Sequence, residues 1–194
     1  MKKPAALPRF KKGAVNIVEE KTRIVLENLE TRRSVRSYRP EQIAEEELNA
    51  VLRAGTFAPT GMNRQSPVIV AVQDRLIRDT LATLNASVLG GTSDPFYGAP
   101  TVVVVLADPS VGTWQEDGSL VLGNMMNAAH ALGLGSCWIH RARQVFEMPE
   151  GKHLLRSWGL PDTLVGVGNC ILGYPDGPLP EARPRKENYT LWIK

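Results

Sequence analysis

The sequence predicts an α+β fold in which a mixed sheet lies between helices on both of its faces. Two observations lead to this prediction. Segments with helical spacing and short apolar runs alternate irregularly along the 194 residues. Most of the predicted strands are far apart in the sequence, so they must pair over long range. No internal repeat or low-complexity linker is present, and this length suits one domain.

Helices are predicted where apolar residues recur at intervals of three and four positions. They cover residues 19–30, 45–54, 74–88 and 118–132, and a shorter helix contains residues 154–158. Strands are predicted where short apolar runs are bounded by glycine, proline or polar residues. They cover residues 68–72, 101–106, 136–139 and 165–172.

The predicted helix 118–132 is apolar on nearly every side, and Asp117 is its predicted N-cap. A helix of this kind is enclosed on most sides, so we expect its own domain or a partner subunit to cover it. The segment from Gly173 onwards is rich in proline, which predicts an extended tail that leans on another part of the structure.

The net charge of +3 is unevenly distributed. Residues 1–12 contain five basic residues and no acidic one, so the other 182 residues carry a net charge of −2. The basic character therefore belongs to the N-terminal segment and gives little reason to expect a nucleic-acid partner.

The sequence favours a cytoplasmic protein. The N-terminal segment lacks the apolar core of a secretory signal, and no apolar run is long enough to span a membrane. The two cysteines, Cys137 and Cys170, form neither a CxxC pair nor a disulfide framework, which fits a reducing compartment.

Several common catalytic motifs are missing from the sequence. It has no GxGxxG after a strand, no GxxxxGK[ST], no GxSxG and no HExxH, and its three histidines do not stand in metal-ligand spacing with the cysteines. These absences exclude a Rossmann pyrophosphate site, a P-loop and a nucleophile elbow, and they predict no bound metal.

Arginine residues form the first candidate binding segment. Residues 32–39 contain four guanidinium groups interleaved with serines, just after a predicted helix. Guanidinium groups are planar bidentate donors, and together with serine hydroxyls they suit a phosphate monoester. A solvated basic loop is the alternative interpretation.

Two further segments have side chains suited to ligands. Arg183, Arg185 and Lys186 lie in the proline-rich tail, where they can either join the first arginines at one phosphate or stay in solvent. The amide groups of Asn63 and Gln65 can hydrogen-bond a heterocycle, or they can cap a turn.

Five motifs occur in order along the chain. They are RRSVR at 32–36, APTGMNRQ at 58–65, FYGAP at 96–100, GLGSCWI at 133–139, and GYP followed by RPRK between 173 and 186. This ordered set resembles the FMN-dependent nitroreductase family. The resemblance implies an N-terminal basic extension at residues 1–24, which has no counterpart in the family pattern, and an FMN-binding domain at residues 25–194.

The resemblance further implies a three-layer α/β/α sandwich with a mixed central sheet. It implies a homodimer with two FMN sites at the subunit interface. The FMN-binding residues that it implies are Arg32, Arg33, Ser34, Arg36, Asn63, Gln65, Trp138, Ile139, His140, Arg183 and Arg185.

Each of these segments has an expected place around the cofactor. Residues 32–36 would follow the phosphate, ribityl and pyrimidine side of FMN, and residues 183–185 would reach the same phosphate. Residues 63–65 would approach the ring from the partner subunit, and residues 138–140 would flank it. His140 and Arg141 stand where classical family members carry a Glu-Gly pair near the flavin N5.

The activity implied is that of an NAD(P)H-dependent FMN oxidoreductase. A hydride would pass from NADH or NADPH through flavin N5 to a nitroaromatic, a quinone or a similar small acceptor in a ping-pong cycle. The flavin performs this chemistry, so no catalytic side chain is required. The alternatives are a specialised dehydrogenase, dehalogenase or flavin-fragmenting enzyme of the same fold, and a non-catalytic flavin-binding protein.

Overall fold

The computed structural model describes residues 17–193. Most of the predicted basic extension, residues 1–16, lies outside the described residues. The first described unit ends at Arg32 and consists mainly of helix α1 (Ile17–Thr31), which confirms the predicted first helix. Within this helix the Arg23 guanidinium forms ion pairs with the carboxylates of Glu20 and Glu27, each at 2.8 Å.

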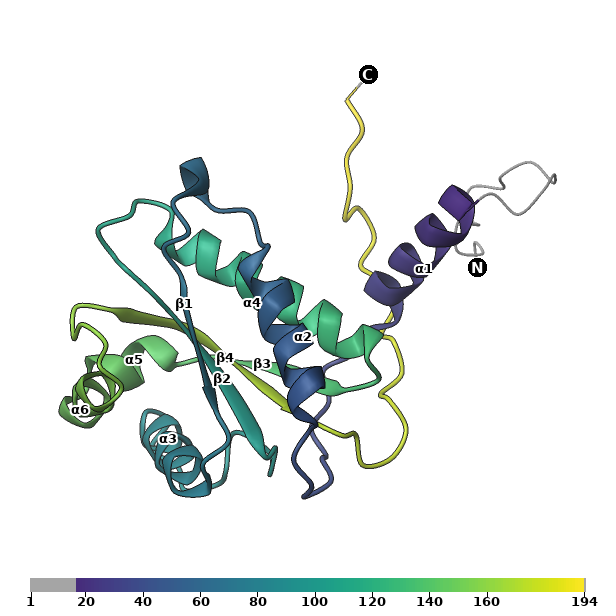
Figure 1. Ribbon diagram of the computed structural model, residues 1–194. Coiled ribbons are helices and arrows are strands. Elements are labelled where there is room, and N and C mark those ends of the chain that lie inside the picture. The colour runs from purple at the N-terminus through teal and green to yellow at the C-terminus, as the bar shows by residue number, and fades with distance from the viewer. Residues whose placement is uncertain (1–16, 194) are drawn as a thin grey trace. The chain divides into compact units, whose positions relative to one another are not determined.

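The second unit, residues 33–193, is built around a four-stranded sheet (Figure 1). Its strands are β1 (Val68–Val72), β2 (Thr101–Ala107), β3 (Gly135–Ile139) and β4 (Val165–Gly173), in the spatial order β1-β2-β4-β3. All three neighbouring pairs are antiparallel. The four strands thus form an antiparallel sheet and not the mixed sheet that the sequence predicts. The one parallel pairing among the described residues is an isolated bridge between Ser34 and Ser136 of β3.

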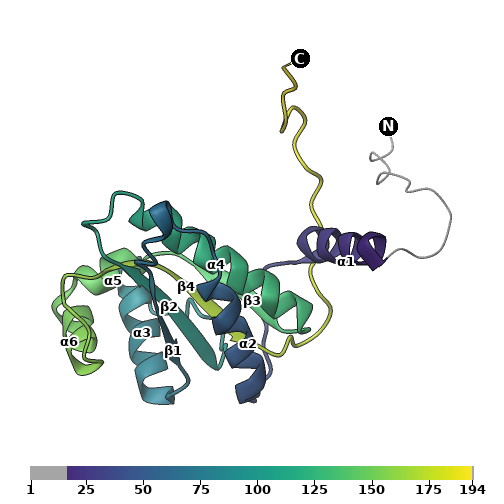
Figure 2. The same cartoon turned by 45° about the horizontal axis from the view of Figure 1, so that its top comes forward.

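Helices cover both faces of this sheet (Figure 2). On one face lie α2 (Glu45–Thr56) and α4 (Trp114–Ala131). On the other lie α3 (Arg75–Ser87), α5 (Ala142–Glu147) and α6 (Pro149–Ser157). The predicted three-layer sandwich is therefore confirmed.

Strand β2 shows why the sheet is buried on both faces. All seven of its side chains are buried, and they alternate between two cores. Val103 and Val105 pack with α2 and α4, whereas Val102, Val104 and Leu106 pack with the helices of the opposite face. The period of two along a strand divides one apolar run between both faces.

Helix α4 differs from its prediction at its N-terminus. It begins at Trp114, four residues earlier than expected, and its N-cap is Thr113. Asp117 therefore lies inside the first turn, and the prediction that it is the N-cap is wrong. Its buried carboxylate instead accepts hydrogen bonds from the Gly61 N–H at 2.9 Å and from the Thr113 hydroxyl at 3.0 Å.

Candidate functional site

The segment that follows Arg33 is fixed to β3, the strand at one edge of the sheet. The Val35 N–H donates to the Ser136 carbonyl oxygen at 3.0 Å, and the Tyr38 hydroxyl donates to the Val35 carbonyl oxygen at 2.7 Å. Val35 and Tyr38 are buried against Gly135, where a β-carbon would lie within about 3.1 Å of both side chains. This packing anchors a segment in which Ser34 is half-buried and Arg36 and Ser37 are exposed.

The C-terminal tail leaves the domain beside the same segment. The Arg39 N–H donates to the Tyr174 carbonyl oxygen and the Asp176 N–H to the Ser37 carbonyl oxygen, both at 3.0 Å. From residue 177 to residue 193 every side chain is exposed. The start of the tail is thus adjacent in space to the first arginine segment, although about 140 residues separate them in the sequence.

Arg36 lies next to Tyr97, a residue that the sequence analysis did not identify as part of a site. Its guanidinium carbon is 5.8 Å from the centroid of the Tyr97 ring. Tyr97 has a left-handed backbone (φ 53°), which is rare for an aromatic residue and marks a turn shaped by its surroundings. The available signal was the FYGAP motif that contains Tyr97, but no residue of that motif was predicted to bind a ligand.

Asp94 holds the loop that carries Tyr97. Its carboxylate accepts hydrogen bonds from the N–H groups of Phe96 at 2.8 Å and Gly98 at 2.9 Å, and it pairs with the buried Arg78. Burial alone would raise the pKa of Asp94. The hydrogen bonds from Arg78, Gly98 and Phe96 outweigh burial, so the pKa is lowered from its ordinary value of 3.8.

We predict that Asp94 makes folding sensitive to acid. Because its pKa is lower in the folded state, its stabilising contribution is complete above pH 3.8 and is lost as the pH falls through the lowered value. The difference in the free energy of unfolding between wild type and Asp94→Asn should be largest near neutral pH and should shrink in acid. Urea unfolding of both proteins, from neutral to acid pH, measures this difference. A difference that does not change with pH would contradict the stabilising role of the Asp94 carboxylate.

Residues 138–140 are divided between the two faces of the sheet. The Ile139 side chain is buried among the residues that pack with α3 and α5, so only its backbone can face a ligand. Trp138 is 47% exposed, and its ring centroid lies 5.4 Å from that of the exposed His140. These two rings form an accessible aromatic pair at the end of β3.

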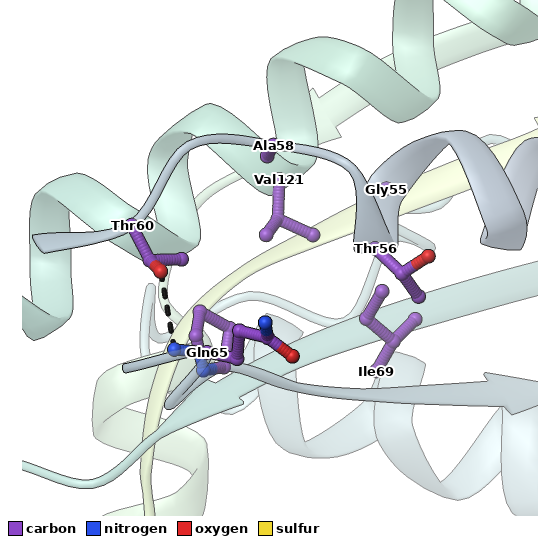
Figure 3. A pocket seen from close by; sticks show the side chains of 8 residues that line it. Gly55, Thr56, Ala58, Thr60, Gln65, Ile69 and Val121 are labelled. Carbon is purple, nitrogen blue, oxygen red and sulfur yellow. Dashed lines mark hydrogen bonds between the residues drawn. The ribbon is translucent and has the colours of Figure 1, made fainter. Parts of the chain in front are cut away.

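The segment around Asn63 and Gln65 borders a cavity of about 280 Å³, shown in Figure 3. Its lining residues come from α2, β1, α4 and the loop between α2 and β1, and they are Gly55, Thr56, Ala58, Thr60, Gln65, Pro67, Ile69 and Val121. The Gln65 N–H donates to the Thr60 hydroxyl at 3.1 Å, and the Gln65 amide donates to the Asn63 side-chain oxygen at 3.2 Å.

This loop has a strained backbone. Met62, Asn63 and Gln65 all have positive φ, between 51° and 54°. None of these three residues is a glycine, so their left-handed conformations cost conformational free energy. Such conformations persist only where surrounding contacts impose them. The hydrogen bond from Gly61 to Asp117 of α4 supplies one such contact.

We therefore expect Asp117→Ala to destabilise the protein by about 1.5–3 kcal/mol, because the Gly61 N–H loses a charged acceptor in a partly buried place. Asp117→Asn keeps one carbonyl oxygen of the same shape and should cost less. Urea unfolding of the two variants gives the comparison. Equal stabilities for both would show that the carboxylate does not anchor the loop.

The other predicted residues lie elsewhere in the chain. Arg32 belongs to the α1 unit, where its N–H donates to the Asn28 carbonyl oxygen. Arg183 and Arg185 lie in the exposed tail, and the Arg185 guanidinium donates to the Arg183 carbonyl oxygen at 3.1 Å. Seven extended residues reach about 25 Å, so Arg183 can lie anywhere within that distance of Asp176.

Other kinds of site are absent from the described part of the chain. Residues 17–193 contain no group of three or more histidine, cysteine or acidic residues placed to hold a metal ion. None of the helices in this range is both long and apolar enough to cross a membrane.

The fold and these residues define the protein as one of the α+β class. Its three-layer domain has an arginine-bearing segment and an exposed aromatic pair along the same strand at the edge of the sheet. The chain belongs to the nitroreductase family, because the model of that family matches residues 29–174.

Comparisons with individual proteins agree with this family. A nitroreductase with bound FMN from Bacteroides fragilis is 30% identical with a TM-score of 0.82, and the match covers 88% of this chain and 98% of that one. An FMN-dependent nitroreductase from Clostridium difficile is 27% identical with a TM-score of 0.78, over 87% of this chain and 98% of that one. A protein of Archaeoglobus fulgidus, provisionally named an NADH dehydrogenase/NAD(P)H nitroreductase, is 32% identical over 156 residues, which are 77% of this chain and 84% of the relative.

Proposed function

We propose that this protein is an NAD(P)H-dependent FMN oxidoreductase that passes a hydride to a small acceptor such as a nitroaromatic or a quinone. The observation that carries the proposal is the pairing of Ser34 and Val35 with Ser136 of β3, the strand that leads to the Trp138–His140 pair. The segment that we propose for the phosphate and the aromatic pair that we propose for the planar ring therefore lie along one strand at the edge of the sheet. Relatives named for FMN and NAD(P)H support this assignment.

The residues present fit FMN. Arg36 is exposed, its guanidinium lies over a tyrosine ring, and no carboxylate of residues 17–193 forms an ion pair with it. Ser136, whose backbone forms the β-bridge to Ser34, has a buried hydroxyl without a hydrogen-bond partner among the described residues. A row of guanidinium and hydroxyl donors beside an aromatic pair suits a ligand that has both a phosphate and a planar heterocycle.

When bound, FMN supplies the hydride chemistry itself. Arg32, Arg33 and Ser34 would hold its phosphate and ribityl chain, and Arg183 and Arg185 would reach the same phosphate from the tail. Arg36 would place a permanent positive charge at the pyrimidine side, where it stabilises negative charge. Trp138 and His140, with the backbone of Ile139, would line the ring and restrict the access of water.

We further propose that the active form is a homodimer. Leu120 and Leu132, on and just after α4, remain 47% and 42% exposed, although we expected this apolar helix to be enclosed. Five large apolar residues of the tail are also exposed, namely Leu179, Tyr189, Leu191, Trp192 and Ile193. A second copy of the chain would cover these groups and would bring Asn63 and Gln65 to the flavin ring.

The protein's cysteines support a cytoplasmic location. Cys137 and Cys170 are both buried, and neither forms a disulfide bond within the described residues. Cysteines that form no disulfide are usual in a reducing compartment.

The proposal is tested by isolating the protein with its cofactor and measuring turnover. We expect one FMN per chain after heat release, and oxidation of NADH or NADPH that depends on a quinone or nitroaromatic acceptor. The FMN should be recovered intact after many turnovers, which separates a reductase from a flavin-fragmenting enzyme. A protein that neither retains nor takes up FMN would overturn the proposal.

A further inference from the structure

The turn that follows β3 has an unusual backbone at Arg141. This residue has φ 75° and ψ 6°, in the left-handed region, and it directly precedes α5 as its N-cap. Residues other than glycine, asparagine and aspartate rarely adopt this backbone conformation, because the β-carbon crowds the following carbonyl oxygen. Something outside the turn must therefore hold Arg141 in this conformation.

Asn85 of α3 makes the contacts that hold the turn. It is only 1% exposed, and its side-chain amide donates to the His140 carbonyl oxygen at 2.9 Å. Its side-chain oxygen accepts a hydrogen bond from Nε of Arg141 at 3.0 Å. One buried side chain thus binds the backbone of one residue and the side chain of the next, across 55 residues of sequence.

The other side of the turn is equally confined. Asn169 of β4 donates to the Ile139 carbonyl oxygen at 3.4 Å. Gly166 lies so close to Ala142 that a β-carbon there would be 2.3 Å from its carbonyl carbon. Two asparagines and a glycine therefore enclose residues 139–142, and of these contacts only that of Asn85 reaches the Arg141 side chain.

We propose that Asn85 is a positioning residue for the flavin site. It fixes the left-handed turn at Arg141 and thereby holds His140 against Trp138, on the strand end where we place the flavin ring. This inference rests on the proposed function. Asn85 acts only through residues 140 and 141, so its loss should alter the environment of the flavin more than the retention of FMN.

The first test is Asn85→Leu, which has the same number of side-chain heavy atoms and the same branching but cannot make either hydrogen bond. In the protein without cofactor, backbone hydrogen exchange in residues 139–145 should become at least about tenfold faster, because the turn opens locally. Exchange in β2, residues 101–107, should stay as in wild type. With FMN bound, the midpoint potential of the flavin should shift and kcat should fall about tenfold or more, with a smaller change in the KM for NAD(P)H.

A matched pair of substitutions at Arg141 separates conformation from side-chain chemistry. Arg141→Ala removes the bond to Asn85 and keeps a β-carbon in the left-handed region, whereas Arg141→Gly removes the same bond and relieves the strain. We expect the glycine variant to keep more activity, a more native flavin potential and slower exchange than the alanine variant. Adding Asn85→Leu to Arg141→Gly should then have less effect than Asn85→Leu alone.

Equal losses in the two Arg141 variants would overturn the proposal, since the guanidinium would then act directly. Unchanged exchange and potential in Asn85→Leu would overturn it as well, even if the melting temperature fell. If Asn85→Leu does not fold, the comparison of Arg141→Ala with Arg141→Gly still tests the proposal. A failure of FMN binding would refute the proposed function. The hydrogen-exchange measurements need no flavin, so they would still test the role of Asn85 in the turn.

Discussion

Arg185→Ala and Arg32→Ala are each expected to weaken FMN binding by about 10- to 100-fold. A hydrogen bond to a charged group contributes about 1.5–3 kcal/mol, and every 1.4 kcal/mol changes the dissociation constant about tenfold. The two arginines lie in segments that are far apart in the sequence, but we place both at one phosphate. Titration of the cofactor-free protein with FMN, followed by the quenching of flavin fluorescence, measures both constants.

Two further measurements sharpen this prediction. Arg75→Ala is the matched control, because the Arg75 side chain is almost fully exposed and its nearest carboxylate, that of Asp79, is 3.9 Å away. This variant should bind FMN like wild type. The double variant Arg32→Ala/Arg185→Ala should lose less than the sum of the single losses if both arginines hold the same group. Wild-type affinity in both single variants would contradict the assignment.

Gly166→Ala is expected to have a large effect on stability. The new β-carbon would lie 2.3 Å from the carbonyl carbon and 2.4 Å from the carbonyl oxygen of Ala142. These are backbone atoms, so β4 and the start of α5 would have to separate. Overpacking of this kind costs about 1–3 kcal/mol or more, and the shift would also displace the turn at Arg141.

Gly91→Ala provides the control for this substitution. A β-carbon at Gly91 meets no atom within 4 Å, so the same chemical change should leave stability within about 0.5 kcal/mol of wild type or slightly raise it. Urea unfolding of the two variants and of wild type gives the comparison. A Gly166→Ala protein as stable as Gly91→Ala would show that the close approach of β4 and α5 is not required.

The periodicity of apolar residues predicted the sheet and most of the helices. The run at β2 and the glycines that follow α3 and α4 identify elements directly, because burial and helix termination are local in sequence. Helix α5, residues 142–147, was not predicted, because six residues are too few to show a period. The sequence analysis placed the N-terminus of α4 too late, since Gln115 and Glu116 interrupt the apolar pattern and Asp117 resembles an N-cap.

The site could be predicted only as a set of segments. The arginine and amide residues were recognisable by their chemistry and their order. Tyr97 and Asn85 were not, because their roles depend on contacts with Arg36 and with residues 140 and 141, which no local pattern encodes. The places of Asn63 and Gln65 and of the tail relative to the cofactor stay predictions, since they depend on the second subunit.

The central claim is that this chain holds a flavin that NADH or NADPH can reduce. The most direct measurement is the visible absorption spectrum of the purified protein under anaerobic conditions, before and after addition of each nucleotide. We predict the absorption of oxidised flavin, bleaching by at least one nucleotide, and recovery when a quinone is added after the nucleotide is removed. A protein loaded with FMN whose spectrum neither nucleotide changes would contradict the account.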